Sequence, residues 1–183
     1  MFNDFIIPFL VVGLAELGDK TQLAVFCLSS KTKDYFKLIL GVMAAFLIAD
    51  GLAILFGEFL TKIIPTFYIK LIAGFVFLIV GIFMLFQKED DEVVCNLKTP
   101  FLSAFTLILI SEMGDKTQIT AALFAVKYNP LFVFMGVMLA LLLLSLMAVY
   151  LGKFIFSKIK KSLISQIAGT LFVLIGVLTL MGI

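Results

Sequence analysis

Six apolar runs, each about as long as a membrane-spanning helix, constrain this sequence more than any other feature. They lie near residues 4–30, 37–60, 68–87, 100–126, 131–156 and 163–183. A helix needs about 20 mostly apolar residues to cross a hydrocarbon core of roughly 30 Å, and these runs are apolar on every face rather than alternating as barrel strands do. With 63% hydrophobic and 14% charged residues, the chain is predicted to be an all-α integral membrane protein with six transmembrane helices. We therefore expect the lipid bilayer as a partner and no nucleic acid.

One motif occurs twice: "ELGDKTQLA" at residues 16–24 and "EMGDKTQIT" at 112–120. The similarity continues, because "GVMAAFLIADGLAILFGEF" from Gly41 aligns with "GVMLALLLLSLMAVYLGKF" from Gly136. We divide the single transmembrane domain, residues 1–183, into repeat 1 (1–87), an acidic cytoplasmic linker (88–99) and repeat 2 (100–183). Each repeat has an odd number of spans, so repeat 2 enters the membrane from the opposite face. Such inverted repeats are typical of secondary transporters, whose substrate site lies near the midplane.

Smaller features complete the expected architecture. Four glycines that recur at seven-residue spacing predict close helix packing, namely Gly74, Gly81, Gly169 and Gly176. The two cysteines, Cys27 and Cys95, are expected to be isolated thiols because their spacing implies no disulfide. The sequence leaves the oligomeric state open, including a homo-oligomer.

Lysine alone carries the orientation signal, because the chain has no arginine or histidine. Nine lysines lie in the loops after spans one, three and five: Lys31, Lys33, Lys37, Lys88, Lys98, Lys153, Lys158, Lys160 and Lys161. Three lie on the opposite side: Lys62, Lys70 and Lys127. Since cytoplasmic loops carry the excess of lysine, we predict a multi-pass inner (plasma) membrane protein with both termini outside. The acidic run at residues 89–92 is interpreted as a solvated linker, or alternatively as a patch that gathers cations.

Both motifs are predicted to lie near the bilayer centre, about 12 residues into their spans. A charge at that depth costs about 2.5–3.5 kcal/mol on insertion scales. Six such charges would cost roughly 15–20 kcal/mol, so they need mutual compensation, a water-filled cavity or a bound ion. On an unbroken helix Glu16, Asp19 and Lys20 share one face. Gly18 and Gly114 permit close helix approach or a local break that frees backbone carbonyls.

Two such faces would gather an all-oxygen site for a hard divalent cation. The predicted ligands are Glu16, Asp19, Gln22, Glu112, Asp115 and Gln118, with Thr21, Thr117, Lys20 and Lys116 lining the site. Four carboxylates and two lysines sum to −2, which one divalent ion neutralises. Without metal the cluster could take up protons instead, and this competition is the minimum requirement for antiport. The lysines either form salt bridges with a switching role or snorkel, and both readings stay open.

Asp50 is a further charge, in the middle of the second span, where the repeat-equivalent residue is Ser145. We interpret Asp50 as a proton-coupling candidate; otherwise it faces a cavity or pairs with a lysine.

Two copies of Glu-x-Gly-Asp-Lys-Thr-Gln, each opening a three-helix half, closely resemble the transmembrane protein 165 family of Ca²⁺/Mn²⁺:H⁺ exchangers (uncharacterised protein family 0016), in its bacterial manganese exporter branch. The resemblance covers essentially the whole chain. It implies that Glu16, Asp19, Glu112 and Asp115 are cation ligands and that the motif threonines and glutamines line the site. It also implies export of Mn²⁺ or Ca²⁺ from the cytoplasm while protons enter, with manganese favoured and no prosthetic group.

Four other readings are weighed against this one. The charges could simply hold helices together, or the chain could export another small solute such as an amino acid. A channel would use the carboxylates as a selectivity ring. An intramembrane aspartyl protease would use Asp19 and Asp115 as a dyad, but glutamate stands where the GxGD motif of those enzymes has glycine, so we expect no enzyme activity.

Overall fold

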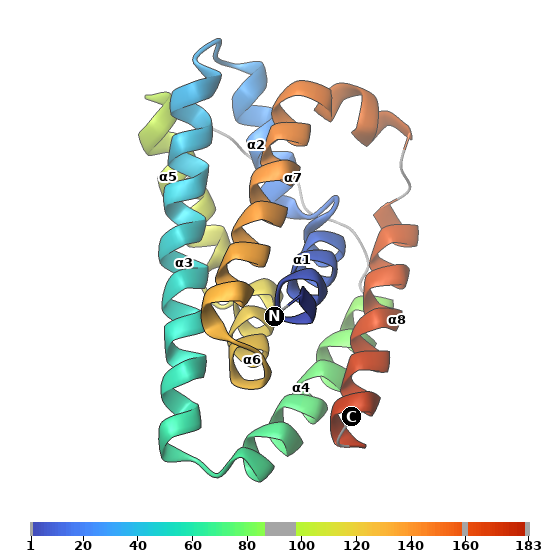
Figure 1. Ribbon diagram of the computed structural model, residues 1–183. Coiled ribbons are helices and arrows are strands. Elements are labelled where there is room, and N and C mark those ends of the chain that lie inside the picture. Colours follow the sequence, from blue (N-terminus) through green and yellow to red (C-terminus); the bar gives the residue numbers. More distant parts are fainter. Residues whose placement is uncertain (1, 87–97, 159–160, 182–183) are drawn as a thin grey trace.

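Figure 1 shows the computed structural model of the chain, which describes residues 2–86, 98–158 and 161–181. These residues form no strand and eight α-helices: α1 (Phe2–Glu16), α2 (Lys20–Ser30), α3 (Tyr35–Ile63), α4 (Thr66–Phe86), α5 (Pro100–Glu112), α6 (Lys116–Lys127), α7 (Pro130–Lys158) and α8 (Lys161–Leu180). Three stretches, Tyr35–Ile63, Phe67–Phe86 and Pro130–Leu151, are long and apolar enough to cross a membrane. Pro100–Glu112 and Gln166–Leu180 are shorter apolar helices. The all-helical prediction is confirmed for the described residues.

Two of the predicted spans are not continuous helices. The run at 4–30 is divided into α1 and α2, and the run at 100–126 into α5 and α6. The break in each case falls inside the repeated motif, directly after its glutamate. The local break left open at the motif glycines is thus present in both runs, and the motif residues do not share one helix face.

The last helix of the first half, α4, packs against the last helix of the second half, α8. Gly74 lies against Gly176 and Gly81 against Gly169, and a Cβ built on Gly81 would lie 2.8 Å from the Gly169 carbonyl oxygen. The prediction of close packing at these glycines is confirmed. Because residue numbers rise along α4 as they fall along α8, the two helices run antiparallel, as Figure 1 shows at its lower right.

In other contacts between the halves, the neighbouring helices run parallel. Gly41 near the start of α3 meets the Phe101 backbone of α5, and Gly57 near its end meets the Ala122 backbone of α6. The equivalent approach recurs where Gly136 of α7 meets the Phe5 backbone of α1. Each broken pair of helices is thus held along an unbroken helix of the other half.

Burial follows this arrangement. Val12 of α1, Leu38 of α3 and Val133 of α7 are fully buried. Large apolar side chains cover the outward faces, for example Leu55 at 61% exposure and Ile79 at 66%. Exposed apolar surface on this scale is typical of a chain surrounded by lipid.

The cysteine prediction needs correction. Cys27 on α2 is disulfide-bonded rather than an isolated thiol. The other cysteine, Cys95, lies outside the described residues, as does the acidic run at residues 89–92.

Candidate functional site

Each motif breaks its helix by the same local geometry. Gly18 and Gly114 have φ of 79° and 83°, a left-handed conformation that glycine adopts at no steric cost. The amide of Asp19 then donates to the Glu16 carbonyl at 3.1 Å, and that of Asp115 to the Glu112 carbonyl at 3.1 Å. Each glutamate therefore ends one half-helix while each aspartate is the N-cap of the next. Of the two roles open for these glycines, the break is the one observed.

The breaks bring carboxylates of both motifs together. One oxygen each from Glu16, Asp19 and Asp115 lie within 4.8 Å of one another. Oxygens that share a Ca²⁺ ion lie about 2.3–2.6 Å from it, and hence up to roughly 5 Å from each other. The spacing fits one hard divalent cation. Glu16 is 1% exposed, so this group lies inside the protein.

The threonines of both motifs converge on one of these carboxylates. The Thr21 hydroxyl donates to Glu16 Oε2 at 3.1 Å, and the Thr117 hydroxyl donates to Glu16 Oε1. On an unbroken helix these side chains would point away from the glutamate. The breaks therefore explain how Thr21 and Thr117 come to line the site.

Lys116 bridges the repeats. Its ammonium forms an ion pair with the Asp19 carboxylate, and the side chains of both residues are 15% exposed. Lys20, the equivalent residue of the first motif, is exposed instead. It lines a cavity of about 400 Å³ with Asp19, Glu112, Asp115 and Lys116. The two lysines thus differ in environment, although their motifs are alike.

Glu112 lies beside the three-carboxylate group rather than within it. It is 1% exposed, and its Oε2 has no hydrogen-bond partner among the described residues. It lies within electrostatic range of Glu16, Asp50 and Asp115. Asp50 is fully buried in α3, and neither of its oxygens has a hydrogen-bond partner in the described part of the chain.

The glutamines are placed differently from each other. Gln118 Oε1 accepts from the Gly114 amide at 2.8 Å, and its Nε2 donates to the Ala49 carbonyl at 3.1 Å. Its oxygen thus stabilises the second break in this conformation. Gln22 is 7% exposed on α2. Neither glutamine belongs to the carboxylate group.

Ser111 was missed in the sequence, yet it lines the 400 Å³ cavity between α4 and the second motif. Its repeat-equivalent residue is the apolar Ala15, so a search for repeated polar residues passes over it. The only feature of the sequence that points to Ser111 is its position directly before Glu112. The apolar wall of the same cavity includes Ile79 and Phe83 of α4.

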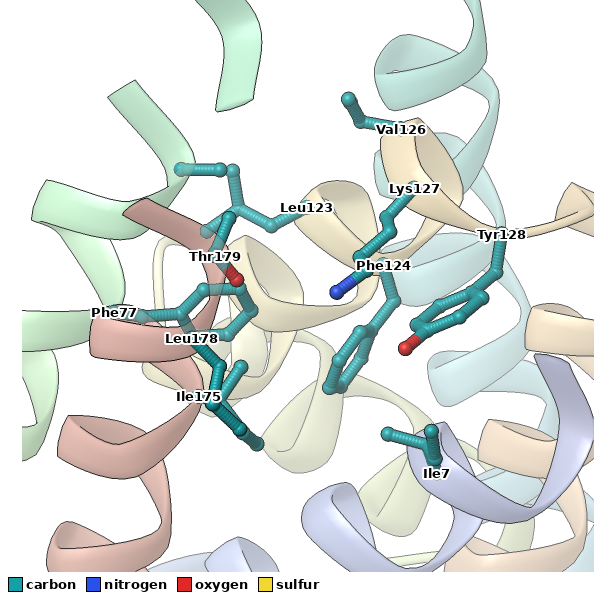
Figure 2. Close-up of a pocket in the computed structure, with 11 residues that line it drawn as sticks. Ile7, Phe77, Leu123, Phe124, Val126, Lys127, Tyr128, Ile175, Leu178 and Thr179 are labelled. Atoms are coloured by element: carbon teal, nitrogen blue, oxygen red, sulfur yellow. The ribbon is translucent and has the colours of Figure 1, made fainter. Parts of the chain in front are cut away.

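A second cavity, of about 240 Å³, has no carboxylate in its lining. Figure 2 shows it between aromatic and aliphatic side chains, with Lys127 and Tyr128 at one side. The Lys127 ammonium lies 5.6 Å from the Tyr128 ring centroid. Lys127 therefore belongs to a different region of α6 from Lys116.

Comparison with known proteins identifies the family. The model of the family "Divalent cation/proton antiporter GDT1" matches residues 4–92 and 100–183. The chain is 30% identical to the "Putative manganese exporter" of Vibrio cholerae over 171 residues, covering 92% of this chain and 86% of that protein. It is 26% identical to GDT1-like protein sll0615 of Synechocystis over 202 residues, covering 98% and 97% of the two chains.

A shorter match, 44% identical over 69 residues, is with the rice chloroplastic GDT1-like protein 2 and covers 37% of this chain and 20% of that one. No solved structure matches the chain. The family match confirms the resemblance first seen in the motifs and identifies a transporter family rather than an enzyme class. The chain belongs to the GDT1 family of divalent cation/proton antiporters.

Proposed function

We propose that this chain is a secondary transporter that exports a divalent cation from the cytoplasm in exchange for protons, with Mn²⁺ favoured over Ca²⁺. The observation that carries the proposal is the meeting of Glu16, Asp19 and Asp115, contributed by both motifs, within 4.8 Å. Oxygen ligands suit hard divalent cations. The relative from Vibrio cholerae that is named a manganese exporter favours Mn²⁺ as the cargo. Glu112, Gln22 and Gln118 complete the ligand set that we propose for the transport cycle.

The two halves are proposed to be inverted repeats. If both halves entered the membrane from the same face, α4 and α8 would run parallel. Their antiparallel contact through Gly81 and Gly169 supports inversion. So does the parallel course of α3 beside α5 and α6, which an uninverted duplication would make antiparallel. A site between inverted repeats has access routes to both membrane faces, as alternating access requires.

The proposed orientation places both termini outside the inner (plasma) membrane. The turn before α3 and the first turn of that helix contain Lys31, Lys33 and Lys37. Lys98 precedes α5, and the start of α5 contacts the start of α3. Lys62 and Lys127 lie at the other ends of α3 and α6. The described lysines in loops and at helix ends thus segregate toward opposite ends of the molecule, in support of a cytoplasmic face at the start of α3.

The test of antiport uses purified protein in liposomes that contain a pH-sensitive dye. Mn²⁺ added on one side is expected to move protons to the other. Glu16→Gln should reduce this movement at least about tenfold, since loss of even an outer-shell partner typically weakens metal binding 10- to 100-fold. Glu58→Gln is the matched control, because Glu58 pairs with Lys62 at 3.0 Å on an exposed part of α3.

Two outcomes would contradict the proposal. Mn²⁺ flux without proton movement would indicate a channel. Transport of an amino acid that survives Glu16→Gln would indicate an exporter of another solute.

Asp50 is proposed as the proton carrier. It is buried at the level of the motifs, lies within electrostatic range of Asp115 and Glu112, and is replaced by Ser145 in the other repeat. Buried carboxyls inside membrane proteins commonly serve proton relays. Asp50→Asn should therefore abolish proton movement while Mn²⁺ binding to the detergent-solubilised protein persists. If Asp50→Asn reduces Mn²⁺ binding as much as proton movement, Asp50 is a metal ligand. If proton movement coupled to Mn²⁺ is unchanged, Asp50 is not the proton carrier.

A further inference from the structure

The 240 Å³ cavity in Figure 2 and the 400 Å³ cavity beside the carboxylates lie along the same two helices, α4 and α6. On α4, Phe77 lines the smaller cavity, and side chains between residues 79 and 84 line the larger one. On α6, side chains between residues 116 and 119 line the larger cavity, and those between 123 and 127 line the smaller one. The smaller cavity therefore lies toward the face at which α6 ends.

One buried face of α6 leads from the carboxylates to this cavity. Thr117, Thr120 and Phe124 share that face, because they follow i, i+3, i+7 spacing, and none is more than 1% exposed. The Thr117 hydroxyl donates to Glu16. Phe124 lies about 10 Å farther along the helix, at 1.5 Å per residue. Since Phe124 lines the smaller cavity, its ring stands between that cavity and the site.

Two further phenylalanine rings pack at this point. The Phe77 ring of α4 lies 5.4 Å from the Phe124 ring and 5.8 Å from the Phe172 ring of α8, measured between centroids. All three residues, called the aromatic group below, are at most 3% exposed. Phe77 and Phe172 are repeat-equivalent, since they end the aligned stretches "IAGFVF" from Ile72 and "IAGTLF" from Ile167. An apolar constriction of this kind blocks ions because it excludes water.

The chemistry of the smaller cavity fits water on the far side of the aromatic group. Thr179 lines the cavity and is 6% exposed, yet its hydroxyl has no hydrogen-bond partner among the described residues. A buried hydroxyl without a protein partner is costly unless water satisfies it. The volume also suffices for a divalent cation with six waters, which take roughly 180 Å³ at about 30 Å³ each. No carboxylate lines the cavity to retain such an ion.

We infer that the 240 Å³ cavity is the vestibule through which the hydrated cation is released at the face where α6 ends. The aromatic group closes this vestibule from the carboxylates in the conformation described here. The inference rests on the proposed exchange of a divalent cation for protons and assigns the route of release.

The helices that contribute the three rings show how the route can open. Phe77 and Phe172 belong to α4 and α8, which are held together through their glycines. Phe124 belongs to α6, which begins at the break in the second motif with Asp115 as its N-cap. A shift of α6 against the α4–α8 pair would therefore separate Phe124 from the other two rings and also move Asp115.

The test measures accessibility and does not require transport. Thr179→Cys reports on the vestibule, and Thr120→Cys reports on the path between Phe124 and the carboxylates. A small, positively charged, membrane-impermeant methanethiosulfonate reagent is applied to each face of membrane vesicles, and the labelling of the parent chain is subtracted. Lys62→Cys identifies the face at which α6 ends, because α3 and α6 run parallel and Gly57 near the end of α3 meets Ala122.

From that face, Thr179→Cys should be labelled in the otherwise native chain at least about tenfold faster than Thr120→Cys. Phe124→Ala or Phe77→Ala should raise labelling of Thr120→Cys from the same face at least about tenfold, the factor that corresponds to 1.4 kcal/mol of lost closure. Phe46→Ala is the matched control, because Phe46 is 3% exposed, as Phe77 is, and lines neither cavity.

Three results would overturn the inference. Thr179→Cys that is not labelled from this face would show that water does not reach the cavity. Equal labelling of the two reporters in the otherwise native chain would show that the rings do not close the route. Rates in both phenylalanine variants within twofold of Phe46→Ala would exclude the aromatic group as the barrier.

If the alanine variants fail to fold, Phe124→Leu is used, which keeps an apolar side chain and should change the labelling of Thr120→Cys in the same direction. The proposed function is tested separately. If the expected labelling is found but Mn²⁺ moves no protons in liposomes, the exchange of cation for protons is refuted, and the water-filled cavity closed by the aromatic group stands.

Discussion

At the scale of single residues, the Glu16 carboxylate accepts hydrogen bonds from two threonine hydroxyl groups. Thr21 comes from its own motif and Thr117 from the other, and both donate to it. A hydrogen bond to a charged group contributes about 1.5–3 kcal/mol. These bonds fix the direction of a carboxylate that also has to face Asp19 and Asp115. We therefore expect the threonines to affect metal affinity without being ligands themselves.

Thr117→Val keeps the shape of the side chain and removes its hydroxyl. Mn²⁺ affinity of the purified protein, measured by calorimetry, is expected to fall about tenfold or more, because 1.4 kcal/mol corresponds to a factor of ten. Thr106→Val is the control, since Thr106 is exposed and donates to the Leu102 carbonyl within α5. Equal affinities for Thr117→Val and the native chain would exclude a role for this bond.

At the scale of helices, the breaks after Glu16 and Glu112 bring carboxylates of the two motifs together. A left-handed residue at Gly18 or Gly114 ends one helix, and the next begins at once with an aspartate N-cap. The turn at each glycine brings the aspartate, lysine and threonine at the start of α2 or α6 close to the glutamates at the ends of α1 and α5. Broken helices in transporters commonly bind ions at such unwound points.

Gly114→Ala tests this dependence. A Cβ at Gly114 meets no atom within 4 Å, so the cost arises from its φ of 83°. Left-handed backbone costs a non-glycine residue roughly 1–2 kcal/mol. We expect a lower thermal unfolding midpoint in detergent and a loss of Mn²⁺ binding. Gly13→Ala is the matched control, because its Cβ would make an ordinary 3.6 Å contact with Ala140. If both variants bind Mn²⁺ like the native chain, the break does not position the site.

At the scale of the whole molecule, helices of both halves surround the carboxylate group of Glu16, Asp19 and Asp115. α4 and α8 cross antiparallel through their glycines, and each broken helix pair lies along the unbroken helix of the other half (Figure 1). The arrangement places Lys33 and Lys62 at opposite ends of the molecule, just before and within the last turn of α3.

Cysteine labelling of intact cells checks the proposed orientation. An impermeant maleimide should label Lys62→Cys from outside and reach Lys33→Cys only after the membrane is permeabilised. The expectation follows from the excess of lysine on cytoplasmic loops. The reverse pattern would place both termini in the cytoplasm and reverse the proposed direction of export.

The sequence by itself determined the membrane environment, the all-helical class and the family, because apolar run length and a repeated motif are local properties of the chain. It also identified Glu16, Asp19 and Asp115 as candidate ligands. The shared helix face expected on an unbroken helix is absent, and the break that the glycines permitted is present. Helical spacing by itself does not show whether a glycine continues the helix or adopts a left-handed turn.

Only the tertiary structure decided which motif residues meet. It brought Thr117 to Glu16 and Lys116 to Asp19, left Lys20 exposed, and used the Gln118 oxygen on the Gly114 amide. Two motifs with the same letters are equivalent in sequence, so no reading of the letters can distinguish them. Their difference arises from how each motif packs against the other helices.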